Sequence, residues 1–229
     1  GGDTRSGDIE VLLVCMEALA KLGLSDFQIN LGNVNFFAGL IDQVDLPAEK
    51  IDALKDALDL KDQTGLEQLL QKIPFDEQDK KIMRSIPHLM GGRTILSDMR
   101  GLVRNDRSRN AIDHLEAIYD VVEDIGLERH LTIDLGEVRG FDYYNGVFFR
   151  AYVPGLGFEV GQGGRYDGLP AKFGHDTPAV GFSFTLDRLE QIVDCNLEAP
   201  AAKTVDSNTK NKFKDAVDLR AKGKTVKLC

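Results

Sequence analysis

Three strand-like segments between residues 147 and 186 follow one another with short connections. They are VFFRAYV (147–153), FEVGQGG (158–164) and AVGFSFTL (179–186). Parallel neighbours would need a helical crossover, and these connections are too short for one, so the strands are expected to run antiparallel. Two more strands are predicted at FQINL (27–31), where apolar and polar residues alternate, and at LTIDL (131–135). The chain is therefore expected to build a largely antiparallel sheet.

Segments with helical periodicity flank these strands. Apolar residues recur at spacings of three and four from Val11 to Leu22, and again from Leu115 to Ile125. Gly23 and Gly126 follow these two runs and are natural C-terminal stops. A further helix is predicted to start directly after a strand, at DRLEQIV (187–193). The predicted fold class is α+β, an antiparallel sheet flanked by helices.

Residues 36–95 differ from the rest, because they are charged and amphipathic and contain no β-rich run. They predict a small insertion of three or four short helices, with a structural or partner-facing role. The predicted division is a core made of residues 1–35 and 96–196, the helical insertion at 36–95, and a tail at 197–229. The tail is expected to be a polar linker followed by a helix, containing Phe213, and a strand.

Composition disfavours several classes of function. The formal net charge of −9 disfavours a broad phosphate-binding face, although a small basic pocket remains open. No run approaches the roughly 18 apolar residues of a membrane span. Three widely spaced cysteines and four scattered histidines suggest neither disulfides nor a metal site, so we expect a cytoplasmic protein without metal or cofactor. The opening GGDTRSGD, without an initiator methionine, is expected to lie inside a longer protein.

The stretch RGFDYYNG (139–146) brings an arginine and two tyrosines together. The guanidinium of Arg139 offers five donors and a permanent charge, which suits a carboxylate or phosphate. Neighbouring residues of a strand face opposite ways, so only one of Tyr143 and Tyr144 is expected to share a pocket with Arg139. A hairpin with a surface arginine and packed aromatics is the alternative interpretation.

A second stretch of the same character is GQGGRYDGL (161–169). Gly163 and Gly164 weaken a strand, a cost usually tolerated where another backbone or a ligand comes close. Tyr166 follows them after Arg165. A plain glycine-rich turn remains the alternative.

The third stretch, AVGFSFTLDRL (179–189), passes from strand to helix. Asp187 can cap the helix N-terminus, and Arg188 then projects beside exposed backbone N–H groups, a possible anion site. An ordinary solvated arginine is the alternative.

Taken together, VRGFDYYNG, GGRYDGL and PAVGFSFTLDRL resemble the catalytic core of histidyl-tRNA synthetases over about residues 1–195. The resemblance implies a class II aminoacyl-tRNA synthetase fold. It also implies histidine-binding roles for Arg139, Tyr144 and Tyr166, with Gly163 and Gly164 allowing close approach of the backbone. Arg188 would be the ATP contact. No segment resembles class II motif 1 or motif 2, so no catalytic residue and no amino-acid activation are expected.

Within this family the chain is more similar to the regulatory subunit of ATP phosphoribosyltransferase. FQINLGNVNFFAGLI, the hairpin with Arg150 in VFFRAY, the short insertion and the brief tail carry that resemblance. It implies a non-catalytic subunit that binds L-histidine and regulates the short-form catalytic subunit, as a homodimer within a hetero-oligomer. Neither a membrane nor tRNA is expected as a partner. A fragment of a histidyl-tRNA synthetase, or a histidine-sensing domain of a larger regulator, are the alternatives.

Overall fold

The computed structural model describes residues 4–138, 143–193, 203–205, 219, 222 and 226–228. It divides into two compact units, residues 1–193 and 194–229. In the second unit, β7 (Lys203–Val205) pairs in parallel with β8 (Val226–Leu228). The strand expected near the end of the chain is therefore present as β8, and the helix expected around Phe213 lies outside the described residues.

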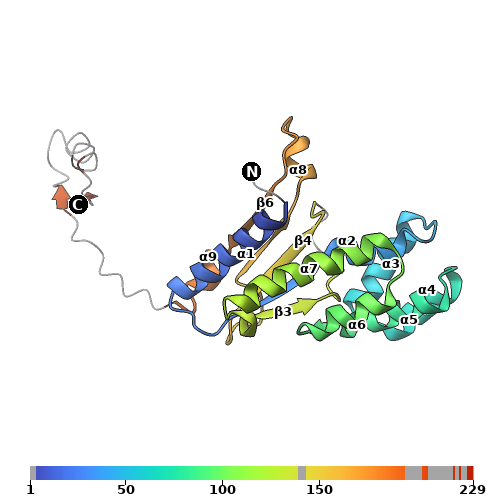
Figure 1. Ribbon diagram of the computed structural model, residues 1–229. Helices are drawn as coiled ribbons and strands as arrows, with labels where there is room; N and C mark the ends of the chain where they lie inside the picture. Colours follow the sequence, from blue (N-terminus) through green and yellow to red (C-terminus); the bar gives the residue numbers. More distant parts are fainter. Residues whose placement is uncertain are drawn as a thin grey trace. The chain divides into compact units, whose positions relative to one another are not determined.

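The first unit contains a six-stranded sheet, drawn in Figure 1. Its strands are β1 (Gln28–Asn33), β2 (Met90–Gly91), β3 (Leu131–Asp134), β4 (Val147–Tyr152), β5 (Gly161–Arg165) and β6 (Val180–Phe184). They are ordered β2-β3-β1-β4-β5-β6. All five strand segments predicted from the sequence contribute, with ends shifted by a few residues.

The sheet is largely antiparallel, as expected, but it is mixed, because one pair of strands runs in parallel. The neighbours β2–β3, β1–β4, β4–β5 and β5–β6 are antiparallel, whereas β1 and β3 run in parallel, with Ile29 opposite Leu131. A parallel pair needs a long crossover, and the segment from residue 34 to residue 130 provides it. The sequence indicated both strands but not that they are neighbours.

Helices α1 (Thr4–Lys21) and α7 (Asp106–Asp124) lie along one face of this sheet (Figure 1). Asn105 caps α7, accepting a hydrogen bond from the Ser108 backbone N–H at 2.7 Å. Gly23 and Gly126 follow the two helices with φ of 81° and 74°, a left-handed conformation that glycine adopts without strain. Both predicted helix ends are thus confirmed.

The segment between β1 and α7 is mostly helical. It contains α2 (Val34–Ile41), α3 (Ala48–Asp59), α4 (Gln63–Lys72), α5 (Glu77–Ser85), the 3₁₀ turn η1 (Ile86–His88) and α6 (Thr94–Leu102). These helices belong to the same compact unit as the sheet. Their buried side chains, such as Leu54, Leu70 and Ile82, continue the core of the sheet. Among the described residues, no helix has the length and apolar character needed to cross a membrane.

The two faces of the sheet differ in chemistry because side chains alternate along each strand. One cross-strand row on the face toward α1 and α7 contains only apolar side chains and one glycine. It consists of Ile133, Leu31, Phe149, Gly163 and Phe182. The neighbouring row on the opposite face is polar throughout: Thr132, Asn30, Arg150, Gln162 and Ser183. We refer to the second set as the polar row. It positions the candidate site.

Candidate functional site

Three tyrosines line a cavity of about 280 Å³ at the edge of the sheet. Tyr143 and Tyr144 come just before β4, and Tyr166 comes just after β5. The ring centroid of Tyr143 lies 4.8 Å from that of Tyr144 and 6.0 Å from that of Tyr166, both in edge-on contacts. Gln162 and Ser183 of the polar row line the same space. We call it the tyrosine cavity.

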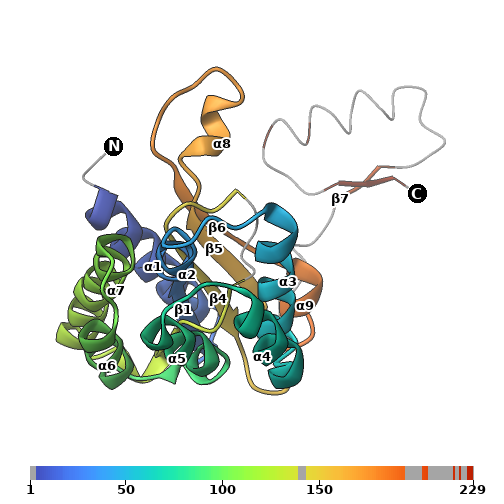
Figure 2. The same cartoon turned by 90° about the vertical axis from the view of Figure 1, so that its right-hand side faces the viewer.

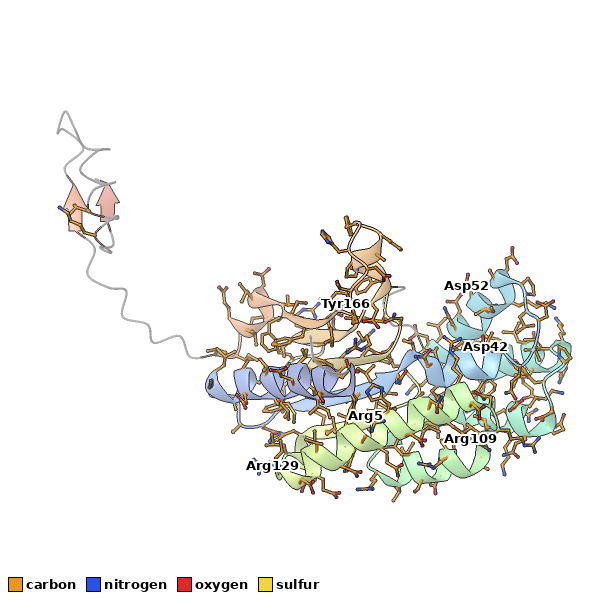
Figure 3. The ribbon with its side chains drawn as sticks, turned by 45° about the horizontal axis from the view of Figure 1, so that its top comes forward. Arg5, Asp42, Asp52, Arg109, Arg129 and Tyr166 are labelled. Atoms are coloured by element: carbon orange, nitrogen blue, oxygen red, sulfur yellow. The ribbon has the colours of Figure 1, made fainter. Side chains whose placement is uncertain are left out.

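The root of the segment that carries α8 (Gly168–Ala171) borders the tyrosine cavity. Leu169 of this helix is one of its lining residues. Figure 3 labels Tyr166 at this root, and α8 projects beyond the strands in Figures 1 and 2. The cavity thus lies between the sheet and a projecting segment.

Tyr143 and Tyr144 share one cavity, although strand geometry predicted that they would face opposite ways. Residue 143 is in a turn and β4 starts only at Val147, so the alternation of a strand does not apply to them. Arg139 was expected beside one of these rings. It falls in residues 139–142, outside the described part of the chain. Its role in the site stays a prediction.

Gly163 and Gly164 make room for protein side chains. A Cβ at Gly163 would lie 2.6 Å from Phe149 Cζ and 2.7 Å from the Gly181 carbonyl oxygen. A Cβ at Gly164 would lie 2.9 Å from Tyr144 Cε1 and 2.7 Å from the Val147 carbonyl oxygen. Neither glycine lines the tyrosine cavity. Gly164 still shapes it, because its bare backbone lets the Tyr144 ring lie against β5.

Burial raises the pKa of the Tyr144 phenol, and a hydrogen bond with Tyr143 raises it further. The group therefore stays protonated at neutral pH and can donate a hydrogen bond. On the same face of the sheet, burial raises the pKa of Asp134, although the backbone N–H groups of Gly136 and Glu137 donate to its Oδ1 at 2.9 and 3.1 Å. Raised or lowered pKa values of this kind are common at functional sites.

Arg150 supplies the charge of the polar row. Its Nη1 lies 3.3 Å from Glu137 Oε2. Burial lowers the pKa of the guanidinium, but the nearby Glu137 carboxylate raises it, and the pKa of Arg150 is raised overall. Sequence reasoning noted Arg150 only as a family difference and did not select Gln162, Ser183 or Asn30. The available signal was a single polar residue within a strand segment that is otherwise mostly apolar, as at Arg150 in VFFRAY and Ser183 in VGFSF.

Arg188 forms an ion pair with a carboxylate of the same chain. Its Nη1 lies 2.9 Å from Glu159 Oε1 and donates to the Glu159 carbonyl oxygen, and its guanidinium stacks 4.6 Å from the centre of the Phe158 ring. The N-cap of α9 (Leu186–Leu189) is Thr185, so the predicted cap at Asp187 was wrong. The helix has only four residues, which leaves little dipole to attract an anion.

Arg165, the residue before Tyr166, is buried and paired. Its Nη2 lies 2.7 Å from Asp8 Oδ1 on α1, and its Nη1 lies 2.8 Å from Asp167 Oδ1. It does not line the tyrosine cavity. The motif GGRYDGL therefore combines a structural arginine with a cavity-lining tyrosine.

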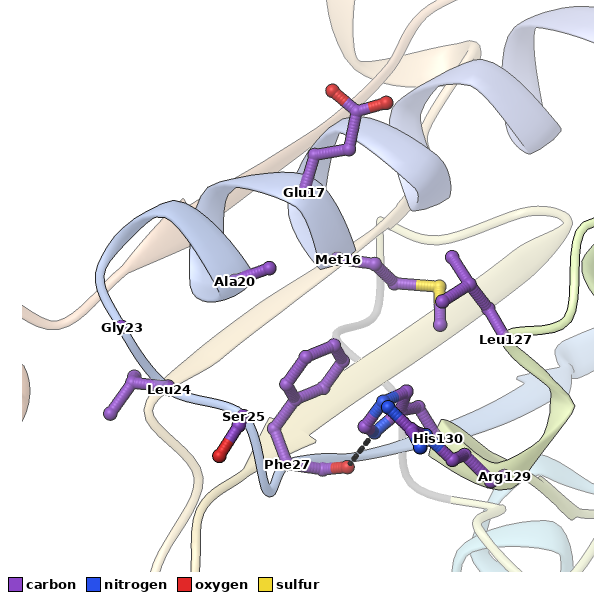
Figure 4. Close-up of a pocket in the computed structure, with 10 residues that line it drawn as sticks. All are labelled: Met16, Glu17, Ala20, Gly23, Leu24, Ser25, Phe27, Leu127, Arg129 and His130. Carbon is purple, nitrogen blue, oxygen red and sulfur yellow. Dashed lines mark hydrogen bonds between the residues drawn. The ribbon is translucent and has the colours of Figure 1, made fainter.

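A larger cavity of about 470 Å³ lies between the end of α1, the start of β1 and the 3₁₀ turn η2 (Glu128–His130), as Figure 4 shows. Its walls are mainly apolar. His130 stacks on Phe27 at 4.1 Å and its Nδ1 bonds to the Phe27 carbonyl oxygen at 2.9 Å. Because a carbonyl only accepts, Nδ1 is the donor, and Nε2 accepts from Arg129 Nε at 3.0 Å. Both ring nitrogens are thus used in holding the turn. Of the predicted site residues that the structure describes, none lines this cavity.

Comparisons with known proteins agree with the sequence motifs. Residues 1–189 match the histidyl-tRNA synthetase family. An ATP phosphoribosyltransferase regulatory subunit from Syntrophotalea carbinolica is 40% identical over 87% of this chain and 46% of its own length. One from Desulfitobacterium hafniense is 36% identical over 100% of the chain and 60% of its own length. The chain thus spans about half the length of the curated relatives it matches.

Solved structures give the same result. An ATP phosphoribosyltransferase regulatory subunit/histidyl-tRNA synthetase from Bacillus halodurans superposes with a TM-score of 0.77 at 28% identity, covering 100% of this chain and 60% of that one. The ATP phosphoribosyl transferase (HisG:HisZ) complex from Thermotoga maritima has a TM-score of 0.62 at 17% identity, covering 80% and 61%, which shows likeness of fold. The predicted resemblance to the regulatory subunit and the synthetase-like fold are thereby confirmed. The chain belongs to the histidyl-tRNA synthetase family, and the curated relatives it matches at 31–40% identity are named ATP phosphoribosyltransferase regulatory subunits.

Proposed function

We propose that this chain is part of a regulatory subunit of ATP phosphoribosyltransferase, and that it binds L-histidine in the tyrosine cavity. The observation that carries the proposal is a cavity of three tyrosines, Gln162 and Ser183 in a chain whose relatives over 87–100% of its length bear that name. Its partner is then the short-form catalytic subunit, in keeping with the HisG:HisZ complex from Thermotoga maritima. Histidine bound here inhibits the complex.

The chemistry of the cavity suits a small amphipathic ligand. Its volume of about 280 Å³ lies just below the range of about 300–1,000 Å³ for pockets of drug-sized ligands, which suits a ligand as small as an amino acid. Tyrosine rings offer flat apolar surfaces to an imidazole, and the protonated Tyr144 hydroxyl can exchange its bond to Tyr143 for one to the unprotonated imidazole nitrogen. The amide of Gln162 and the hydroxyl of Ser183 can both donate and accept. Arg139 is the proposed partner of the ligand carboxylate.

We propose no intrinsic catalytic activity for this subunit. The support comes from Arg188, the residue expected to contact ATP in a synthetase, because Glu159 already neutralises its charge. An ATP phosphate would have to displace that pair. The alternative, a histidyl-tRNA synthetase, is favoured by the family match over residues 1–189. Histidine-dependent exchange of pyrophosphate into ATP by the full-length protein would establish the alternative and exclude a purely regulatory role.

The partnership is tested with the full-length protein that contains this chain. We expect it to co-purify with a short-form catalytic subunit from the same organism and to make that subunit sensitive to histidine. Light scattering of the purified complex measures the proposed dimer of regulatory subunits within it. Separate elution of the two proteins at micromolar concentration would remove the main support for this function. The proposal places both proteins in the cytoplasm.

The site is tested by isothermal titration of histidine. Arg139→Ala removes a charge-assisted hydrogen bond and is expected to weaken binding roughly 10- to 150-fold. Tyr144→Phe removes one neutral hydrogen bond and is expected to weaken binding about fivefold. Tyr119→Phe is the matched control, since Tyr119 lies on α7 away from the cavity. Unchanged affinity in both site variants would show that histidine does not bind here.

A further inference from the structure

The tyrosine cavity is built by two separate segments of chain, and one buried arginine contacts the supports of both. Tyr143 and Tyr144 precede Asn145, whereas Tyr166 lies between Arg165 and Asp167. Arg165 is only 5% exposed and Asp8, its partner on α1, only 2%. Charges this deep in a protein are costly unless they are paired, so their arrangement fixes the local geometry closely.

The guanidinium of Arg165 holds two elements at once. Its Nε and Nη2 donate to Asp8 Oδ1 at 2.9 and 2.7 Å, which ties the end of β5 to helix α1. Its Nη1 donates to Asp167 Oδ1 at 2.8 Å. The same oxygen accepts from the Ala179 backbone N–H at 2.8 Å, which closes the base of the segment that carries α8. Tyr166 is thus held from both sides.

The first tyrosine segment is fixed to the same network through Asn145. The Asn145 backbone N–H donates to the Arg165 carbonyl oxygen at 3.0 Å, and its side-chain Oδ1 accepts from the Asp167 backbone N–H at 3.2 Å. A Cβ at Gly146 would lie 3.1 Å from Arg165 Cδ, so the chain after the tyrosines packs directly on the arginine stem. Arg165 therefore contacts the chain segments that support both walls of the cavity.

Helix α7 contributes to the arrangement from the other side of Asp8. His114 Nε2 lies 3.2 Å from Asp8 Oδ2, while Arg165 occupies Oδ1. The carboxylate of Asp8 therefore lies between His114 on α7 and Arg165 on β5.

We infer that Arg165, held by Asp8, is a positioning residue that sets the relative placement of Tyr143, Tyr144 and Tyr166 and so controls ligand binding without touching the ligand. A buried ion pair adds little net stability compared with apolar packing, whereas a guanidinium fork imposes direction and distance. This inference deepens the proposed histidine site and rests on it only for the affinity measurement.

The test uses the full-length protein with Asp8→Asn, which keeps the shape and removes the charge, and Arg165→Lys, which keeps the charge and removes the fork. Leu12→Ala is the matched control, because Leu12 is a buried residue of the same helix that takes no part in the network. The first measurement is the rate of tyrosine nitration below the melting temperature, mapped to single residues by mass spectrometry. The second is histidine affinity by titration.

We expect Asp8→Asn and Arg165→Lys to speed nitration of Tyr144 and Tyr166 severalfold and to leave Tyr119 unchanged. We also expect them to weaken histidine binding about tenfold, the effect of about 1.4 kcal/mol of distorted contacts. Leu12→Ala should lower the melting temperature and change neither quantity. If both network variants behave like Leu12→Ala, the pair is purely structural and the inference is wrong. If the unmodified protein binds no histidine, the proposed function fails, and nitration alone still decides the positioning role.

Discussion

The apolar row and the polar row of the central sheet are made by the same strands, face opposite sides and have opposite chemistry. Phe149 and Arg150 are neighbours on β4, yet Phe149 is buried under the helices with 1% exposure while Arg150 belongs to the polar row. Gly163 and Gly164 divide in the same way on β5, the first against Phe149 and the second against Tyr144. A one-residue slip of either strand would exchange the two sets.

The two faces are expected to contribute differently, one to the stability of the fold and the other to ligand binding. The apolar face joins the core with α1 and α7, so its side chains should control the free energy of unfolding. The opposite face holds a partly exposed arginine, a carboxyl with a raised pKa and the tyrosine cavity, so its side chains should control binding. Paired substitutions at adjacent positions can test this division directly.

The largest contrast is expected between Phe149→Ala and Arg150→Gln. Removing the buried ring should lower the free energy of unfolding by about 3–5 kcal/mol, because a cavity is left in the core. Removing the guanidinium should cost less than about 1 kcal/mol, since its pair with Glu137 is partly exposed to solvent. Urea unfolding of the two variants measures both values. Similar losses would show that the polar face is also part of the stabilising core.

The adjacent glycines give the second contrast. Gly163→Ala and Gly164→Ala should each destabilise the protein by about 1–3 kcal/mol, because the added Cβ meets a backbone oxygen 2.7 Å away in both cases. Only Gly164→Ala also displaces the Tyr144 ring, so it alone should weaken histidine binding. Thermal melts and titration calorimetry on both variants measure the two effects. Equal loss of affinity would mean that Gly163 contributes to the cavity as well.

Alkaline pH sharpens the comparison at Tyr144. The pKa of this phenol is raised in the folded protein, so the folded state keeps its proton after the unfolded state begins to lose it near pH 10. The stability contributed by this group is therefore complete below about pH 10 and falls as the pH rises further. We expect Tyr144→Phe to flatten the decline in melting temperature between about pH 10 and 11, and Tyr119→Phe to leave that decline in place. If the melting temperature of Tyr144→Phe falls with pH as steeply as that of the unmodified protein, the Tyr144 phenol is exposed to solvent and its pKa is not raised.

The smallest effect is expected at Asp134. Its raised pKa means that ionisation is disfavoured in the folded state, so its contribution to stability is present below about pH 3.9 and is lost as the pH rises through the folded value. Asp134→Asn keeps an acceptor for the Gly136 and Glu137 N–H groups and removes the charge. We expect it to stabilise the protein at pH 7 by less than about 1 kcal/mol. A lower melting temperature at pH 7 would show that the charge itself has a stabilising partner.

Strand and helix positions were predictable where periodicity is local, as in β1, β4 and α7. The parallel pairing of β1 with β3 was not, because nothing local in either strand encodes a neighbour about a hundred residues away, beyond the reach of periodicity. At the site, the motifs drew attention to Tyr144 and Tyr166, which line one cavity, while their histidine-binding roles stay predictions. They could not show that Tyr143 joins them, because a turn replaces the strand there, or that Arg165 is turned toward Asp8, a contact made across 157 positions of sequence.

The central place of β1 has a consequence for synthesis on the ribosome. Both of its neighbours, β3 and β4, are encoded after the whole helical crossover that ends at residue 130. At about 5–20 residues per second, translation of that crossover takes roughly 5–20 s. During that interval neither edge of β1 can pair with its native neighbour, whereas α1 and the helices of the crossover are already made and can cover it. The crossover is thus complete before the strand at the centre of the sheet gains either neighbour.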